Sequence, residues 1–163
     1  MSPSDRAAYV IATGFGAGFA PVAPGTVGAL EGIGLFLAVR ALGFGELNLF
    51  VGLVILNIAL FLLGVATSSK TCGVIGVADP HQIVIDEISG QLISLTPLAL
   101  LPSFSLAGLI IGFGLFRLFD IFKPYPIRKL ERLPGGLGVM ADDALAGIYA
   151  AVLLWCGQLL FLR

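Results

Sequence analysis

Six of the ten acidic residues in this 163-residue chain fall in three short places, each beside an apolar run. They are Asp79, Asp86, Glu87, Asp120, Asp142 and Asp143. Carboxylates at the edge of a membrane segment are costly when unpaired, so they are functional candidates. Adjacent acids also repel each other, and Mg²⁺ relieves such repulsion by taking carboxylate oxygens together with water and phosphate oxygens. The pattern predicts one or two Mg²⁺ ions held by Asp86, Glu87, Asp142 and Asp143, with Asp79 and Asp120 as further ligands or as the base.

Basic residues lie between these acids, directly after Asp120. Lys123 and Arg128 are suited to neutralising a phosphate, whose oxygens take both metal ions and cationic side chains as partners. The string Pro24-Gly25-Thr26 precedes an apolar run, and a helix that starts there offers backbone N–H groups and a hydroxyl to an anion. We therefore predict phosphate binding by Thr26, Lys123 and Arg128. The same signals also fit a plain helix start and an ordinary positively charged loop.

Other chemistries find no support among the motifs. His81 is the only histidine and Cys72 and Cys156 are far apart, which disfavours zinc. No Cys-x₅-Arg or Asp-x-Asp-x-Thr phosphatase motif is present, so metal-activated water is the expected nucleophile. Glycines 14, 16 and 18 match neither a Walker A loop nor a dinucleotide fingerprint. The net charge of −1 and the absence of a binding motif argue against nucleic acid as a partner.

The elements that must position these acids are apolar helices. Hydrophobic residues make up 58% of the chain and charged residues only 12%, which is typical of a protein dissolved in a bilayer. Four apolar regions cover 27–42, 47–67, 83–122 and 144–162. The third is too long for one crossing and breaks at Leu101-Pro102-Ser103, which predicts a helical hairpin. We expect an all-α, polytopic membrane helix bundle with about five membrane-embedded helices, forming a single domain over residues 1–163.

Counting membrane crossings puts the acids on one side. If 83–122 is a hairpin, the segments 13–26, 67–82 and 123–143 share one membrane face, together with most Lys and Arg residues. Arg40 and Arg163 fall on the other face. The positive-inside rule makes the acid-bearing face cytoplasmic. The apolar stretch after Arg6 carries three glycines, so we expect it to stay in the protein rather than to be cleaved as a signal peptide.

Three strings in this order resemble the phosphatidylglycerophosphatase A family. They are TGFGAGFAPVAPGTVG (13–28), ADPHQIVIDEISG (78–90) and FRLFDIFKPYPIRKLERLPGGLGVMADDALAG (116–147). The family's acidic positions map onto Asp79, Asp86, Glu87, Asp120, Asp142 and Asp143, and its phosphate-side candidates map onto Thr26, Lys123 and Arg128. The resemblance implies a bacterial inner-membrane enzyme that requires Mg²⁺ and hydrolyses phosphatidylglycerophosphate to phosphatidylglycerol and phosphate, with its active site facing the cytoplasm.

Two rival functions share some of these features. A cation- or proton-coupled transporter also carries acids among membrane helices, but it needs them near the bilayer midplane rather than at one boundary. A metal-dependent alcohol phosphatidyltransferase acts on the same headgroups, but its wider, fixed aspartate spacing is missing here. The residues leave the oligomeric state open.

Overall fold

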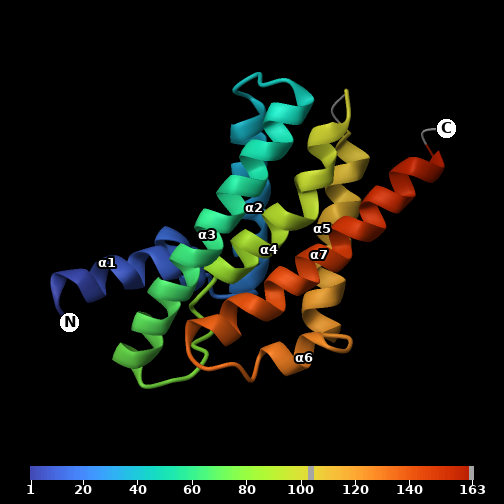
Figure 1. Ribbon diagram of the computed structural model, residues 1–163. Helices are drawn as coiled ribbons and strands as arrows, with labels where there is room; N and C mark the ends of the chain where they lie inside the picture. Colours follow the sequence, from blue (N-terminus) through green and yellow to red (C-terminus); the bar gives the residue numbers. More distant parts are fainter. Residues whose placement is uncertain (103–104, 162–163) are drawn as a thin grey trace.

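The structure, a computed structural model, describes residues 1–102 and 105–161, and every regular element within these ranges is a helix (Figure 1). The α-helices are α1 (Pro3–Ala12), α2 (Pro24–Arg40), α3 (Glu46–Ile75), α4 (Ile85–Leu95), α5 (Leu106–Phe122), α6 (Ile127–Leu130) and α7 (Gly136–Phe161), and two 3₁₀ segments are η1 (Gly14–Phe19) and η2 (Thr96–Leu100). The all-helical expectation is confirmed. Ser103 of the predicted turn, and Leu162 and Arg163 at the predicted end of the last helix, lie outside the described residues.

Successive long helices run in alternating directions. The starts of α2, α4 and α7 and the ends of α3 and α5 lie at the same end of the bundle, the lower end in Figure 1. The chain leaves helical structure at Leu101, and the Ser105 hydroxyl caps α5 by accepting from the Gly108 N–H at 3.0 Å. The predicted helical hairpin in 83–122 is therefore confirmed as α4–η2 followed by α5.

Two predicted helix limits are wrong. Helix α3 continues past Thr67 to Ile75 and ends at Gly76, whose φ of 77° suits a left-handed helix cap. Helix α7 begins at Gly136 rather than at Ala144. Hydropathy alone marks the apolar centre of a helix, whereas its polar ends persist when small residues allow close packing against neighbours. As a result Asp142 and Asp143 lie within α7 and not in a loop before it.

Only α3 and α7, among the described residues, are long and apolar enough to cross a membrane. In the most apolar part of α3 only 22% of residues are buried inside the protein, so most of this apolar surface is exposed. Helices α2 and α5 have 17 residues each and α4 has 11, against roughly 20 needed for a full span. The two long helices support membrane association, while the structure does not confirm five embedded helices.

The N-terminal segment braces the lower end of α3. A reciprocal capping box starts α1: Ser2 Oγ accepts from the Asp5 N–H and Asp5 Oδ2 accepts from the Ser2 N–H. Lys70 of α3 holds α1 through a hydrogen bond to Ser4 Oγ at 2.9 Å and an ion pair with Asp5 at 3.6 Å. The tight turn of η1 then leads the chain to the start of α2.

Helix α4 is the centre of the bundle, since it contacts α2, α3, α5 and α7. Its approach to α7 depends on two glycines that face each other. A Cβ built at Gly147 would overlap the Gly90 carbonyl oxygen, and one built at Gly90 would lie 2.7 Å from the Asp143 carbonyl oxygen. The absence of side chains at both positions brings the acid-bearing turns of α4 and α7 together.

This contact predicts opposite effects for two glycine substitutions on α7. Gly147→Ala is expected to lower the free energy of unfolding by about 1–2 kcal/mol, because the added methyl group overpacks the α4 contact. Gly157→Ala is the matched control: nothing lies within 4 Å of a Cβ there, so it should be neutral or raise stability by roughly 0.5 kcal/mol through helix propensity. Unfolding in detergent measures both. Equal effects of the two substitutions would contradict the packing argument.

Candidate metal and phosphate site

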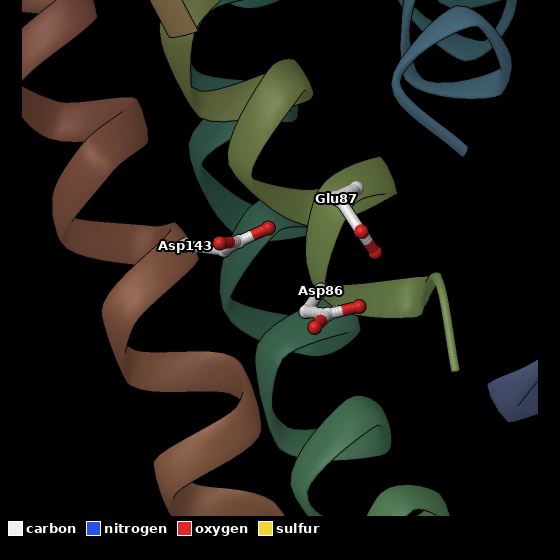
Figure 2. Close-up of side chains that lie close together, drawn as sticks. All are labelled: Asp86, Glu87 and Asp143. Carbon is white, nitrogen blue, oxygen red and sulfur yellow. The ribbon is translucent and has the colours of Figure 1, made fainter. Parts of the chain in front are cut away.

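Three carboxylates from two helices meet at the lower end of the bundle. Asp86 and Glu87 stand in the first turn of α4, where the helix dipole favours negative charge, and Asp143 reaches across from α7 (Figure 2). One oxygen from each side chain can be chosen so that all three lie within 4.8 Å of one another. This is the convergence that one divalent cation requires.

The burial of these oxygens supports a cation as their partner. Asp86 Oδ1, Glu87 Oε2 and Asp143 Oδ2 are buried and have no hydrogen-bond partner. Buried carboxylate oxygens without partners are strongly unfavourable in a folded protein, and like charges at this separation add repulsion. An all-oxygen donor set is what Mg²⁺ prefers. The residues present therefore fit a hard divalent ion.

Asp142 points to a different partner, although it neighbours Asp143. Successive residues on a helix are rotated by about 100°, so adjacent side chains diverge. Asp142 Oδ2 accepts a hydrogen bond of 2.6 Å from Lys123 Nζ, and Glu131 lies 3.6 Å from the same ammonium. Partial burial opposes the charge of Lys123, but the bond to Asp142 and the nearby carboxylates outweigh it and raise the pKa of Lys123. Lys123 therefore stays protonated at neutral pH.

Asp120 lies at the end of α5 and joins the acid group from a third helix. Its carboxyl group borders Glu87 and Asp143. Asp120 Oδ2 also forms an ion pair of 2.6 Å with Arg117 Nη1, one turn earlier on α5. Sequence reasoning missed Arg117, although its i,i+3 spacing from Asp120 was a usable signal of a shared helix face.

Asp79 lies in the loop between α3 and α4, on the rim of a small cavity. This cavity, of about 260 Å³, is also lined by Glu131, Gly138 and Asp142. Asp79 is also close enough to Asp86 for their charges to interact. All six predicted acids thus gather at one end of the bundle, with Asp86, Glu87 and Asp143 converging and the other three bordering them.

The predicted phosphate-side residues occupy different settings. Thr26 is in the first turn of α2, where its N–H and that of Val27 donate to the Ala23 carbonyl oxygen, which leaves the Gly25 N–H and the Thr26 hydroxyl for a ligand. Arg128 is exposed on α6 and lines a shallow surface depression of about 330 Å³ with Lys123, Tyr125 and Lys129. Of the backbone N–H groups expected in Pro24-Gly25-Thr26, that of Gly25 has no acceptor among the described residues and that of Thr26 is engaged.

The sequence profile of one protein family, phosphatidylglycerophosphatase A, matches residues 10–158 of the chain. The chain belongs to this family. The matched range contains all six acidic residues of the site described above, from Asp79 to Asp143. Family membership makes the chain an enzyme of a lipid phosphatase family.

Three curated relatives agree with the family match. A phosphatidylglycerophosphatase A of Haemophilus influenzae is 41% identical over 92% of this chain and 88% of its own length. The Escherichia coli protein of that name is 36% identical over 90% and 81%. A Bacteroides thetaiotaomicron protein, named provisionally as a phosphatidylinositol-3-phosphatase, is 40% identical over 89% of both chains. No solved structure matches the chain significantly.

Proposed function

We propose that this chain hydrolyses phosphatidylglycerophosphate to phosphatidylglycerol and inorganic phosphate, and that it requires Mg²⁺. The observation that carries the proposal is the convergence of three carboxylates, each with a buried oxygen that lacks a hydrogen-bond partner, in a chain of this family. The names of two relatives support the substrate. The whole chain, residues 1–163, acts as a single membrane-embedded phosphatase domain.

Asp86, Glu87 and Asp143 hold the metal, and Asp142 stands next to them as a further ligand or as the anchor of Lys123. When bound, Mg²⁺ polarises the phosphoryl oxygens and makes a coordinated water a better nucleophile. Asp120 and Asp79 border the carboxylate group, and either is placed to accept the proton of the attacking water. The ester P–O bond breaks, and the lipid alcohol leaves with a proton.

In this proposal the phosphate group is bound by Thr26, Lys123 and Arg128. Thr26 lies in the first turn of α2, directly after Gly25, whose backbone approaches the Glu87 carboxylate. Lys123 brings a permanent positive charge to Asp142, and Arg128 with Lys129 makes the nearby surface depression basic. Such charges attract a doubly phosphorylated lipid headgroup.

The reaction takes place at headgroup depth on the cytoplasmic face of the bacterial inner membrane. Support comes from the gathering of the acids and most basic residues at one end of the bundle, which the positive-inside rule assigns to the cytoplasm. In this arrangement α2, α3, α4–η2, α5 and α7 are the five embedded helices, and the acyl chains never leave the bilayer.

A transporter finds less support than a phosphatase. Transport needs a path between both faces, whereas Asp86, Glu87 and Asp143 meet at the start of α4 and in the first half of α7. The provisional name of the Bacteroides relative raises a second candidate substrate, a phosphorylated inositol lipid. Both candidates are phosphomonoesters on a lipid polyol, so the same metal site serves either.

Phosphate release by the purified protein in detergent micelles tests the proposal. We expect release from phosphatidylglycerophosphate to fall to background after chelation and to return on adding Mg²⁺, because buried oxygens of Asp86, Glu87 and Asp143 have no hydrogen-bond partner in the described part of the protein. Phosphatidylinositol 3-phosphate and phosphatidic acid serve as comparison substrates. Release that persists in chelator, or a clear preference for either comparison lipid, would refute the proposed activity.

A further inference from the structure

Arg117 is a partly buried cation beside the acid group, and the proposed mechanism leaves it unused. Its side chain is only 18% exposed, on the face of α5 that carries Asp120. Nη1 lies 2.6 Å from Asp120 Oδ2, yet this contact is not aligned as a hydrogen bond, and Nη1 has no other acceptor. An arginine N–H group without an acceptor in the protein interior is unfavourable unless a ligand completes it.

The guanidinium group points toward the place where α2 starts. A Cβ built at Gly25 would overlap the Glu87 carboxylate and would lie 3.3 Å from Arg117 Nη1. The bare backbone of Gly25 therefore lets Glu87 of the metal group and Arg117 approach the same point. Arg117, on α5, is thus close to the proposed metal group.

The other cations near the site are less suited to direct phosphate contact. Lys123 is already engaged by Asp142 at 2.6 Å and Glu131 at 3.6 Å. Arg128 is exposed on the surface of α6. A guanidinium group stays charged at all relevant pH values, and its rigid fork matches two phosphate oxygens at once.

We propose that Arg117, oriented by Asp120, binds the non-bridging oxygens of the phosphoryl group and is a further catalytic residue. This inference rests on the proposed phosphatase function. Asp120 is then a positioning residue for the guanidinium group, in addition to its place beside the carboxylates. The alternative is a purely structural role, in which Arg117 only neutralises Asp120.

The test compares Arg117→Met and Arg117→Lys with matched variants at Arg132, an exposed arginine in the loop before α7. We expect Arg117→Met to lower kcat/KM for phosphatidylglycerophosphate about a hundredfold, and Arg117→Lys to lie between it and the wild type. Both Arg132 variants should stay within about threefold of the wild type.

Binding of inorganic phosphate separates the two roles of Arg117. If Arg117 only neutralised Asp120, its replacement would not change phosphate binding. In the presence of Mg²⁺, phosphate should raise the melting temperature of the wild type and of the Arg132 variants, but not that of Arg117→Met. The Mg²⁺ concentration for half-maximal thermal stabilisation should change by less than about twofold in Arg117→Met. This measurement needs no turnover, so it separates a wrong substrate from a wrong role for Arg117.

Several outcomes would overturn the inference. They are a phosphate shift that survives in Arg117→Met, activity within about threefold of the wild type, or a wild-type protein whose melting temperature phosphate does not change. If Arg117→Met does not fold, Arg117→Lys decides the matter. Arg117→Lys keeps a positive charge beside Asp120 but loses the guanidinium group. If phosphate binding is unchanged in this variant, Arg117 serves only as the counter-ion of Asp120.

Discussion

Asp143→Asn is expected to lower the rate of phosphate release about 10⁴-fold while the helix bundle stays folded. In the proposed mechanism catalysis depends on electrostatic stabilisation by a metal, and asparagine offers a neutral oxygen in place of a carboxylate. Asp143 is 3% exposed and joins α7 to the first turn of α4, so neither water nor another side chain can replace it easily. Asp86→Asn, on the opposite helix, should behave in the same way.

The same substitution should change stability in opposite directions with and without metal. Without metal, two ionised carboxylates about 4–5 Å apart repel each other by on the order of 3 kcal/mol at an effective dielectric constant near 20. Removing one of them should raise the melting temperature in chelator. With Mg²⁺ at about 100 times its Kd, the wild type gains about 2.7 kcal/mol, and the variant should lose most of that gain.

Asp5→Asn is the matched control, since Asp5 lies on α1 and pairs with Lys70 outside the acid group. It should keep activity within about twofold and should show the wild-type response to Mg²⁺. Activity and calorimetric unfolding of Asp143→Asn, with Mg²⁺ and with chelator, give the result. A variant that keeps near-normal activity, or one that is destabilised equally in both conditions, would show that Asp143 is not a metal ligand.

The gathering of the acids could be predicted from sequence because it depends on topology. Counting helices requires 83–122 to be a hairpin if Asp86 and Asp143 are to meet, and the structure has that hairpin. Hydropathy and turn residues were sufficient for this step, because they report where helices are interrupted. They do not report which way a side chain points along a helix.

The direction of each side chain could not be predicted from the sequence, and it decides which partner each acid has. The last helix starts at Gly136, so the phase of α7 sends Asp143 to α4 and Asp142 to Lys123. A prediction that places both aspartates in a loop cannot separate their roles. Arg117 was missed for a related reason: in an apolar string it stands out only when its partner one turn later, Asp120, is considered with it.

The ion pair between Lys123 and Asp142 is expected to show the largest effect of a single side chain on stability. Lys123→Met should lower the free energy of unfolding by about 3 kcal/mol, because it leaves the Asp142 carboxylate buried without its cation. The side chain of Asp142 is 7% exposed and that of Lys123 is 22% exposed, so water can replace little of the lost bond. Methionine keeps the length of the lysine stem and adds no new backbone strain at this left-handed helix end, where φ is 44°.

A second substitution should repair stability but not activity. In Lys123→Met/Asp142→Asn the uncompensated charge is gone, so we expect about 2 kcal/mol of the loss to return. Phosphate release should stay low in both variants, because the proposed site has lost a positive charge on its phosphate side. Unfolding in detergent with chelator present, and turnover with Mg²⁺, measure the two quantities separately.

Adding the single variant Asp142→Asn completes a double-mutant cycle with Lys123→Met, and this cycle decides which role Asp142 has. If Asp142 mainly anchors Lys123, Asp142→Asn alone should leave the Mg²⁺ requirement unchanged and should reduce turnover about as much as Lys123→Met does. If Asp142 is a metal ligand, Asp142→Asn alone should instead raise the Mg²⁺ concentration needed for half-maximal activity by about tenfold or more. The direct 2.6 Å bond to Lys123 favours the anchoring role, because an oxygen that accepts from an ammonium group is a weaker metal donor. An intact Lys123 would then place its charge where the phosphate leaves the metal.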